Sequence, residues 1–295
     1  MLLVLALPSV IYAGPNIIRH RRNAALIAAV TYKRDADALA LLKAGADANF
    51  REEDAPSSTA ERLRFTLYGQ PADTDRNTAL ILLLRQTDVY HNPPDQVPSL
   101  ELFRELLKRG ANPNGMVGGS LPMVAVASNL PDPVYLQLML EHGGNVNGAD
   151  KTGMTPLMVA AMWHNEPAIK LLIEHGADVN HRDRAGITAL QYLTSGGPRF
   201  RKPEHFEMLC DMLLAHGANI DTADGEGKTP LMRAAEDGSL ANIKALLARH
   251  ARTDLKTVKG KTALDMAGNM RGTPAEIKAI TALLMDAANR QRLQK

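Results

Sequence analysis

The sequence predicts an all-α protein, a solenoid in which short helix–turn–helix repeats stack on one another. The clearest copy of the repeating unit runs from Gly148 to Asn180. The spacing is regular, because Gly110, Gly143 and Gly176 recur every 33 residues. Aromatic residues make up only 4% of the chain, which suits thin helix layers filled by alanine and leucine. One such unit cannot bury its own apolar faces, so neighbouring units must stack.

The unit from Gly148 to Asn180 contains the signals for two helices. Gly153 lies in a turn, where glycine adopts a positive φ at little cost. Thr155 offers an N-cap hydroxyl and Pro156 follows at the first helical position, where its missing N–H is not needed. After Pro167, a second apolar helix is predicted to end at Gly176 in a left-handed cap.

Two strings of this unit resemble those of the ankyrin-repeat family. Residues 155–161 read TPLMVAA, close to the family's Thr-Pro-Leu-His-x-Ala-Ala, and residues 176–180 read GADVN, which matches the family's closing string. Met158 replaces the family's histidine, so the side-chain hydrogen bonds that brace the turns should be lost there. The resemblance implies an ankyrin-type solenoid with short turn fingers.

The register of these strings gives about seven repeats between residues 23 and 288, which is most of the chain. The first repeat is expected to have helices near Asn23–Thr31 and Ala36–Lys43, and the last helix is expected from about Ala275. Residues 1–22 are assigned as a possible signal peptide and N-terminal cap, and residues 289–295 as the polar tail of the capping helix. Insertions are expected near residues 50–72, 87–98 and 195–203.

The first residues have the pattern of a secretory signal. An apolar run from Leu2 to Ile11 is followed by small residues up to Gly14, and it is too short to span a bilayer. No Lys or Arg precedes the run, whereas Arg19, Arg21 and Arg22 follow it. We expect cleavage after Met1–Ala13 and export to the periplasm or the exterior, with no membrane span in the mature chain. The alternative is a cytoplasmic protein whose N-terminal helix covers the first repeat.

Composition and motifs indicate binding rather than chemistry. With 34 basic and 32 acidic residues, the net charge of +2 gives no footprint for nucleic acid. The sequence contains no phosphate-binding loop, nucleophile elbow, paired-cysteine motif or His-Glu-x-x-His string. Cys210 is expected to be a buried thiol in a second helix. We expect no enzymatic activity, no catalytic residues and no cofactor.

Two columns of polar residues recur at equivalent positions and are interpreted as parts of the fold. His142, His175 and His216 each precede a closing glycine, and stacked helices about 8–10 Å apart cannot bring such residues to one zinc ion. We therefore expect no metal site, and we expect these histidines to interact with the helix C-termini. The second column, Asp150, Asp183 and Asp224, should bond backbone N–H groups inside the turns.

The resemblance to ankyrin repeats implies a monomeric protein-binding scaffold whose partner, another protein, lies against the turns and inner helices. The alternatives are a neutralising or regulatory subunit of a specific enzyme or toxin, and a structural envelope protein. Trp163, the single tryptophan, is either an interface anchor or a cover for the insertion at Pro131–Pro133 or Ser195–Pro203. The implied contacts, carried over by position, are Lys151, Thr152, Met154, Met162, Trp163, Arg184, Ala185, Ile187, Glu226, Lys228, Glu236, Asp237, Lys259 and Lys261.

Overall fold

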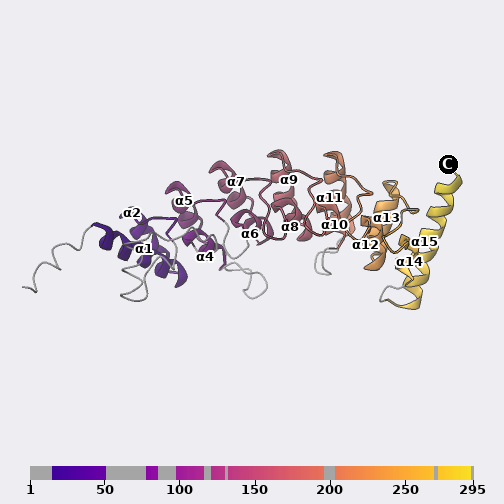
Figure 1. Ribbon diagram of the computed structural model, residues 1–295, viewed down its shortest axis with the longest axis horizontal. Coiled ribbons are helices and arrows are strands. Elements are labelled where there is room, and N and C mark those ends of the chain that lie inside the picture. The colour runs from indigo at the N-terminus through magenta and orange to yellow at the C-terminus, as the bar shows by residue number, and fades with distance from the viewer. Residues whose placement is uncertain are drawn as a thin grey trace, which may run out of the picture. The chain divides into compact units, whose positions relative to one another are not determined.

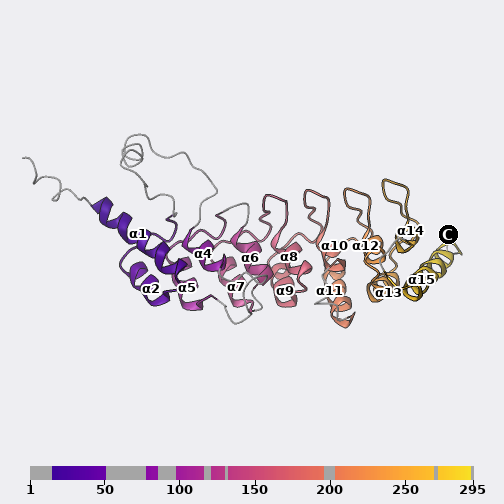
Figure 2. The ribbon, with the colours of Figure 1, turned by 90° about the horizontal axis from the view of Figure 1, so that it is seen from below.

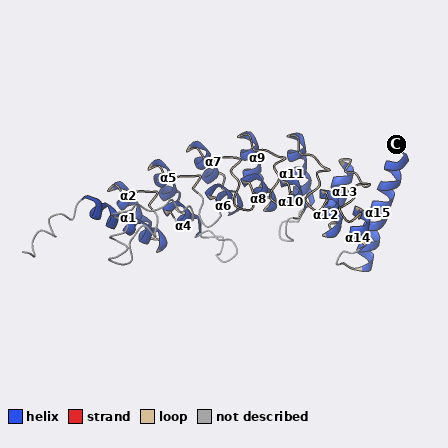
Figure 3. Cartoon of the chain, viewed as in Figure 1, coloured by secondary structure: helices blue, strands red, loops and turns tan. Residues whose placement is uncertain are grey.

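The computed structural model describes residues 15–50, 78–85, 98–115, 121–129, 132–195, 203–268 and 272–293. All the secondary-structure elements in these ranges are α-helices, which confirms the predicted all-α fold class (Figure 3). Met1–Ala13 and nearly all of the three expected insertions lie outside the described residues. Among the helices that are described, none is both long and apolar enough to cross a membrane.

The described helices form seven consecutive pairs, one for each predicted repeat, and the chain divides into two units. In each unit the first helices of the pairs form one layer and the second helices form another (Figure 1). The first unit, Met1–Leu130 with Val134–Asn145, holds α1 (Pro15–Thr31), α2 (Asp35–Lys43), α4 (Ala79–Arg85), α5 (Leu100–Lys108), α6 (Pro122–Asn129) and α7 (Val134–Glu141). The second unit, Pro131–Pro133 with Val146–Lys295, holds α8 (Pro156–Met162), α9 (Glu166–Glu174), α10 (Ala189–Thr194), α11 (Pro203–Ala215), α12 (Pro230–Glu236), α13 (Leu240–Ala248), α14 (Ala263–Ala267) and α15 (Pro274–Leu293).

The first helix of repeat four begins as the sequence predicts, with a threonine cap. The Thr155 hydroxyl accepts a hydrogen bond from the Met158 N–H at 3.4 Å, and Pro156 occupies the first position of α8. The Thr155 N–H in turn lies 3.5 Å from the Met158 sulfur, a weak acceptor. Met158 therefore keeps one local contact of the capping box, although it cannot brace a neighbouring turn as a polar side chain could.

The core of each repeat consists of small and aliphatic side chains. Leu157, Ala160 and Ala161 of α8 are buried, and Ile169 of α9 packs into the same interior with no exposed surface. Cys210 of α11 is fully buried, as predicted for a thiol in a second helix. Because the alanines occupy little volume, the first helices of neighbouring repeats can approach closely, as α8 and α10 do.

Within each unit, asparagine side chains join one closing loop to the next. The Asn180 amide donates to the Gly217 carbonyl at 2.8 Å and accepts from the Asn219 N–H at 3.0 Å. We call this pair of bonds the Asn clasp. The same clasp is made by Asn49 to Gly110 and Asn112, by Asn114 to Gly143 and Asn145, and by Asn147 to Gly176 and Asp178.

Both ends of the repeat array differ from the expectation. The first helix α1 begins at Pro15 rather than near Asn23, and the Arg22 guanidinium donates to the Ala44 carbonyl at the end of α2. At the other end, Gln291 was expected in a polar, water-facing tail, but it is half-buried. Its amide donates to the Ala251 carbonyl at 2.8 Å and accepts from the Thr253 N–H at 3.0 Å. Gln291 thus performs on repeat six the function that a clasp asparagine performs elsewhere.

The clasp yields a stability prediction for Asn180. Asn180→Ala removes both bonds to the next repeat and should lower the free energy of unfolding by about 1–2 kcal/mol, because each bond contributes roughly 1 kcal/mol. Asn180→Asp retains the acceptor and should lose about half as much. Such a half-clasp already joins the closing loops of repeats five and six, where Asp221 accepts from the Arg252 N–H at 2.9 Å. Urea denaturation of the two variants tests the order, and an unchanged midpoint for Asn180→Ala would contradict it.

Candidate protein-binding surface

Each turn of the second unit is folded around one side-chain oxygen. In the second of these turns, Asp183 Oδ1 accepts from the Ala185 N–H at 2.9 Å and from the Ile187 N–H at 2.8 Å. Asp150 and Asp224 make the same two bonds in their turns. In the last turn Thr257 takes this place, and its hydroxyl accepts from the Lys261 N–H at 3.1 Å. The prediction that these aspartates serve the fold is confirmed.

Backbone hydrogen bonds connect the tip of each turn to the next. The Arg184 N–H donates to the Thr152 carbonyl at 3.0 Å. Gly225 donates to the Ala185 carbonyl at 2.7 Å, and Val258 donates to the Glu226 carbonyl at 3.0 Å. Figure 2 shows that the turns of this unit project on the same side of its helices. We call residues 151–152, 184–185, 225–226 and 258–259 the turn-tip row.

Glycine is required where the turns meet. Gly186 has a φ of +78°, and a Cβ built on it would lie 2.8 Å from the Gly225 nitrogen. Gly227 has a φ of +80°, and its Cβ would lie 2.8 Å from the Val258 nitrogen. A residue with a side chain at either position would have a strained backbone. Its Cβ would also push against the nitrogen that donates to the preceding turn tip.

The structure places the sequence-predicted contact residues in two groups. Those near the turns comprise Lys151, Thr152, Arg184, Ala185, Glu226, Lys259 and Lys261, which are exposed, and Met154, Ile187 and Lys228, which are half-buried. The other group lies at the C-terminal ends of the first helices and comprises Met162, Trp163, Glu236 and Asp237. Six of the fourteen predicted residues, Lys151, Thr152, Arg184, Ala185, Glu226 and Lys259, therefore lie in the turn-tip row.

Lys228 connects the two groups electrostatically. Its ammonium lies 2.9 Å from a Glu236 carboxylate oxygen and 3.0 Å from one of Glu226. The hydrogen bond to Glu236 raises the pKa of Lys228, and the bond to Glu226 adds to this effect. Three of the predicted contact residues are thus committed to one another, so each contributes less to an interface than its exposure implies.

Two side chains that the sequence analysis missed brace the turns from the first helices. The Tyr192 hydroxyl donates to Asp183 Oδ2 at 2.6 Å, and the Arg233 guanidinium pairs with Asp224 Oδ2. Burial and the bond to Asp183 raise the pKa of Tyr192 above its ordinary value. Both residues stand four positions after a capping threonine, where repeat four has Val159. A comparison of that position across the repeats could have identified them.

Trp163 ends α8 and is half-buried, and the residue after it has an unusual backbone. His164 has a φ of +53°, at the position where repeat six has Gly238 with a φ of +70°. The His164 Nε2 lies 3.1 Å from the Leu193 carbonyl, and its ring stands edge-on to His205 at 6.1 Å. Burial lowers the pKa of His164, so the ring is neutral at pH 7. Its contacts tie the end of α8 to α10 and α11.

The column of histidines caps helix ends. Nδ1 of His142 lies 2.9 Å from the Leu138 carbonyl, and Nδ1 of His175 lies 2.8 Å from that of Leu171. A carbonyl only accepts, so these nitrogens must carry the proton. His216 makes the same contact to Met212 at 2.9 Å. Across the described ranges, no group of three or more His, Cys, Asp or Glu side chains is arranged to hold a metal ion.

Cys210 gives a prediction about reactivity. Burial raises the pKa of its thiol to about 12, so the thiolate that reacts with disulfide reagents is scarce at pH 8. Native protein should react with Ellman's reagent at pH 8 at least about a hundredfold more slowly than denatured protein. Rapid, stoichiometric reaction of the folded protein would show that α11 opens readily or that the thiol is not buried.

The contact between turn tips gives a second prediction, with a matched pair of variants. Gly176→Ala and Gly186→Ala both place a side chain on a positive φ, but a Cβ at Gly176 meets nothing within 4 Å. Gly176→Ala should therefore cost about 1–2 kcal/mol, the strain of a left-handed backbone alone. Gly186→Ala should cost at least about 1 kcal/mol more, because it also displaces the Gly225 nitrogen. Equal thermal and urea stabilities would mean that the tips are not in contact.

Comparison with protein families agrees with this geometry. A family model described as ankyrin repeats (3 copies) matches residues 96–183, and one described as ankyrin repeats (many copies) matches residues 213–267. The unmatched stretch between them contains the insertion predicted near residues 195–203. No curated protein matches the chain. The paired helices, the turns built around Asp150, Asp183 and Asp224, and the two matches together show that this chain is an ankyrin-repeat protein.

Proposed function

We propose that this protein is a binding scaffold that holds another protein against the turn-tip row of its second unit. Ankyrin repeats generally mediate protein–protein interactions. The observation that carries the proposal is the ladder of backbone bonds from Thr152 to Val258, which fixes the tips while their side chains remain exposed. A surface ordered before binding loses less conformational entropy when the partner docks.

The side chains on and behind the row have the composition of a protein interface. Lys151, Arg184 and Glu226 supply charges of both signs at the tips, and Met154 and Ile187 supply half-buried apolar surface behind them. Protein interfaces combine an apolar centre with a polar rim, whereas a nucleic-acid surface needs a longer run of cations. The arrangement therefore favours a protein partner.

Two carboxylates that could serve in acid–base chemistry are used by the fold. The carboxylate of Asp183 holds two backbone N–H groups and the Tyr192 hydroxyl, and that of Asp224 holds two N–H groups and Arg233. Ankyrin-repeat proteins are typically interaction scaffolds without enzymatic activity. These carboxylates shape the surface, and the function proposed for it is recognition.

Capture of the partner from the source cell, followed by affinity measurements on single variants, tests the proposal. Trp163→Ala should weaken the complex about thirtyfold or more, because removal of an aromatic anchor typically costs about 2–4 kcal/mol. Arg184→Glu, which reverses a charge on the row, should reduce the association rate strongly at low salt. Glu226→Ala should change little beyond the salt dependence, since Glu226 already pairs with Lys228.

The melting temperature of each variant must be measured alongside its affinity. If Trp163→Ala lowers stability and leaves affinity unchanged, Trp163 is a packing residue. If Arg184→Glu also leaves the association rate unchanged, the turn-tip row is not the interface and the proposal fails. A tight one-to-one complex would identify a regulatory or neutralising subunit, whereas retention on wall or membrane fractions without a discrete partner would contradict the scaffold.

A further inference from the structure

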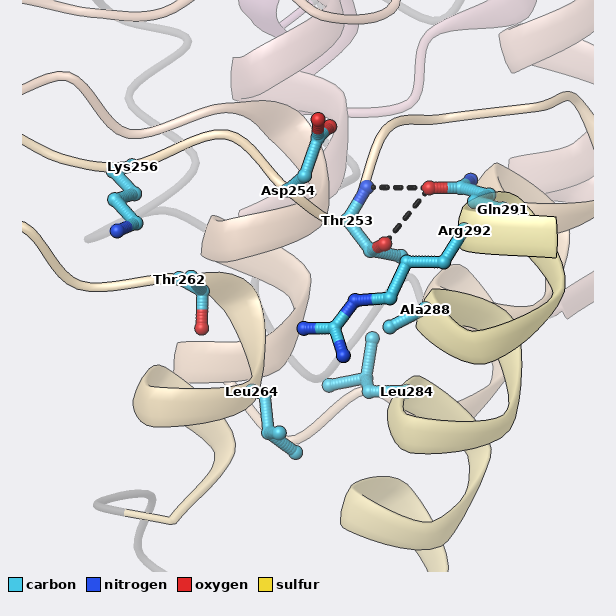
Figure 4. Close-up of a pocket in the computed structure, with 9 residues that line it drawn as sticks. All are labelled: Thr253, Asp254, Lys256, Thr262, Leu264, Leu284, Ala288, Gln291 and Arg292. Carbon is cyan, nitrogen blue, oxygen red and sulfur yellow. Dashed lines mark hydrogen bonds between the residues drawn. The ribbon is translucent and has the colours of Figure 1, made fainter. Parts of the chain in front are cut away.

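A pocket of about 200 Å³ lies at the base of the last turn of the second unit (Figure 4). Leu264 of α14 and Leu284 and Ala288 of α15 supply its apolar floor. Lys256, at the start of the turn, and Arg292, near the end of α15, stand on its rim. Figure 4 shows the Arg292 guanidinium extending over the two leucines, toward the side where Lys256 lies. One cation thus stands over a small apolar surface, and a second lies to one side of it (Figure 4).

Neither cation of this rim forms a close ion pair with an acidic side chain of the described residues. Lys256 and Arg292 are exposed, and neither has an ion-pair partner within 4.0 Å among the residues that the structure describes. Asp254 also lines the pocket, but the Arg252 guanidinium holds both of its carboxylate oxygens at 3.0 Å. The nearby Asp265 is held by the N–H and hydroxyl of Thr262, each at 2.8 Å. These bonds, aided by the lysine charges, lower the pKa of Asp265.

The turn above the pocket also combines exposed cations with an exposed apolar side chain. Lys259 and Lys261 are exposed on it, and Val258 at its tip is 74% exposed. Val258 also belongs to the turn-tip row, because its N–H bonds the Glu226 carbonyl. The pocket and the end of the proposed binding surface are therefore continuous through residues 256–261. A partner that reaches the last tip of the row passes directly over cationic and apolar groups.

We infer that the pocket and residues 256–261 bind an acidic segment of the partner protein. A Glu or Asp carboxylate of that segment would lie between Lys256 and Arg292, and an adjacent aliphatic side chain would rest on Leu264 and Leu284. The small volume suits one side chain rather than a free organic ligand, since small-molecule sites usually exceed about 300 Å³. A bare phosphate would leave the apolar floor uncovered. The inference rests on the proposed function, because it names the chemistry of the partner.

The test uses the full-length protein and a random-peptide library displayed on phage. Selected peptides should be enriched in Asp or Glu next to Leu, Ile or Val. A synthetic, fluorescein-labelled copy of the enriched sequence should bind in anisotropy titrations, and Lys256→Gln and Arg292→Gln should each weaken it about tenfold, as expected for a lost charge contact. The control is Lys278→Gln, an exposed cation on the same helix α15 but far from the pocket. It should leave the affinity unchanged.

Several results would overturn the inference. These are a selected pool without acidic enrichment, equal affinity for a peptide whose acids are replaced by their amides, and unchanged affinity in Lys256→Gln and Arg292→Gln. Competition by a single-stranded oligonucleotide as effective as that by the peptide would point instead to phosphate. If Arg184→Glu disrupts capture of the cellular partner while Lys256→Gln and Arg292→Gln do not, the scaffold function stands and the acidic-segment inference fails.

Discussion

The structure depends above all on the Asn clasp, because it satisfies backbone groups that no helix can satisfy. Each repeat closes with an exposed loop whose carbonyl and N–H groups lie outside any helix. The clasp gives a hydrogen-bond partner to one carbonyl and one N–H of the loop, as Asn180 does for the Gly217 carbonyl and the Asn219 N–H. Since the partner groups belong to the next repeat, the bond that completes one loop also fixes the register of its neighbour. In the closing loop of repeat six, where Asp221 makes only half a clasp, Gln291 of α15 bonds a neighbouring carbonyl and N–H, those of Ala251 and Thr253.

The register that is fixed at the closing loops determines which backbone groups meet at the turns. Once neighbouring repeats are aligned, the N–H of Gly225 meets the carbonyl of Ala185, and the ladder of turn tips follows. The atoms that hold this ladder are backbone atoms and buried or committed carboxylates, so the side chains at the tips are left unconstrained. That separation lets Arg184 and Val258 occupy equivalent positions with different chemistry. It explains how one scaffold can present a partner-specific surface.

Local signals in the sequence were sufficient to predict the fold, because the fold is made of local contacts. Thr155, Pro156 and Gly176 each specify a cap through their own chemistry. Features that depend on a neighbouring repeat were harder to foresee. The contact between Gln291 and Thr253 joins residues far apart in the sequence, and no spacing rule indicates it.

The candidate surface was predictable only in part, for the same reason. Exposure of the tips follows from their position in the repeat, but the ion pairs of Lys228 with Glu226 and Glu236 depend on side-chain directions that a sequence pattern does not contain. The bracing contact of Tyr192 with Asp183 likewise appears only when the helix and the turn are seen together. The pocket beneath Arg292 is lined by Thr253 and Asp254 of repeat six and by α14 and α15 of repeat seven, so no single repeat specifies it.

The ladder of turn tips can be tested most directly by amide hydrogen exchange, measured residue by residue with NMR on the unbound protein. The account predicts slow exchange for the N–H groups of Arg184, Gly225 and Val258, which donate to the preceding tips. Exchange should be fast at Lys259, whose amide makes no hydrogen bond within the described residues. If the three tip amides exchange as fast as Lys259, the tips are not ordered before binding, and the central claim is wrong.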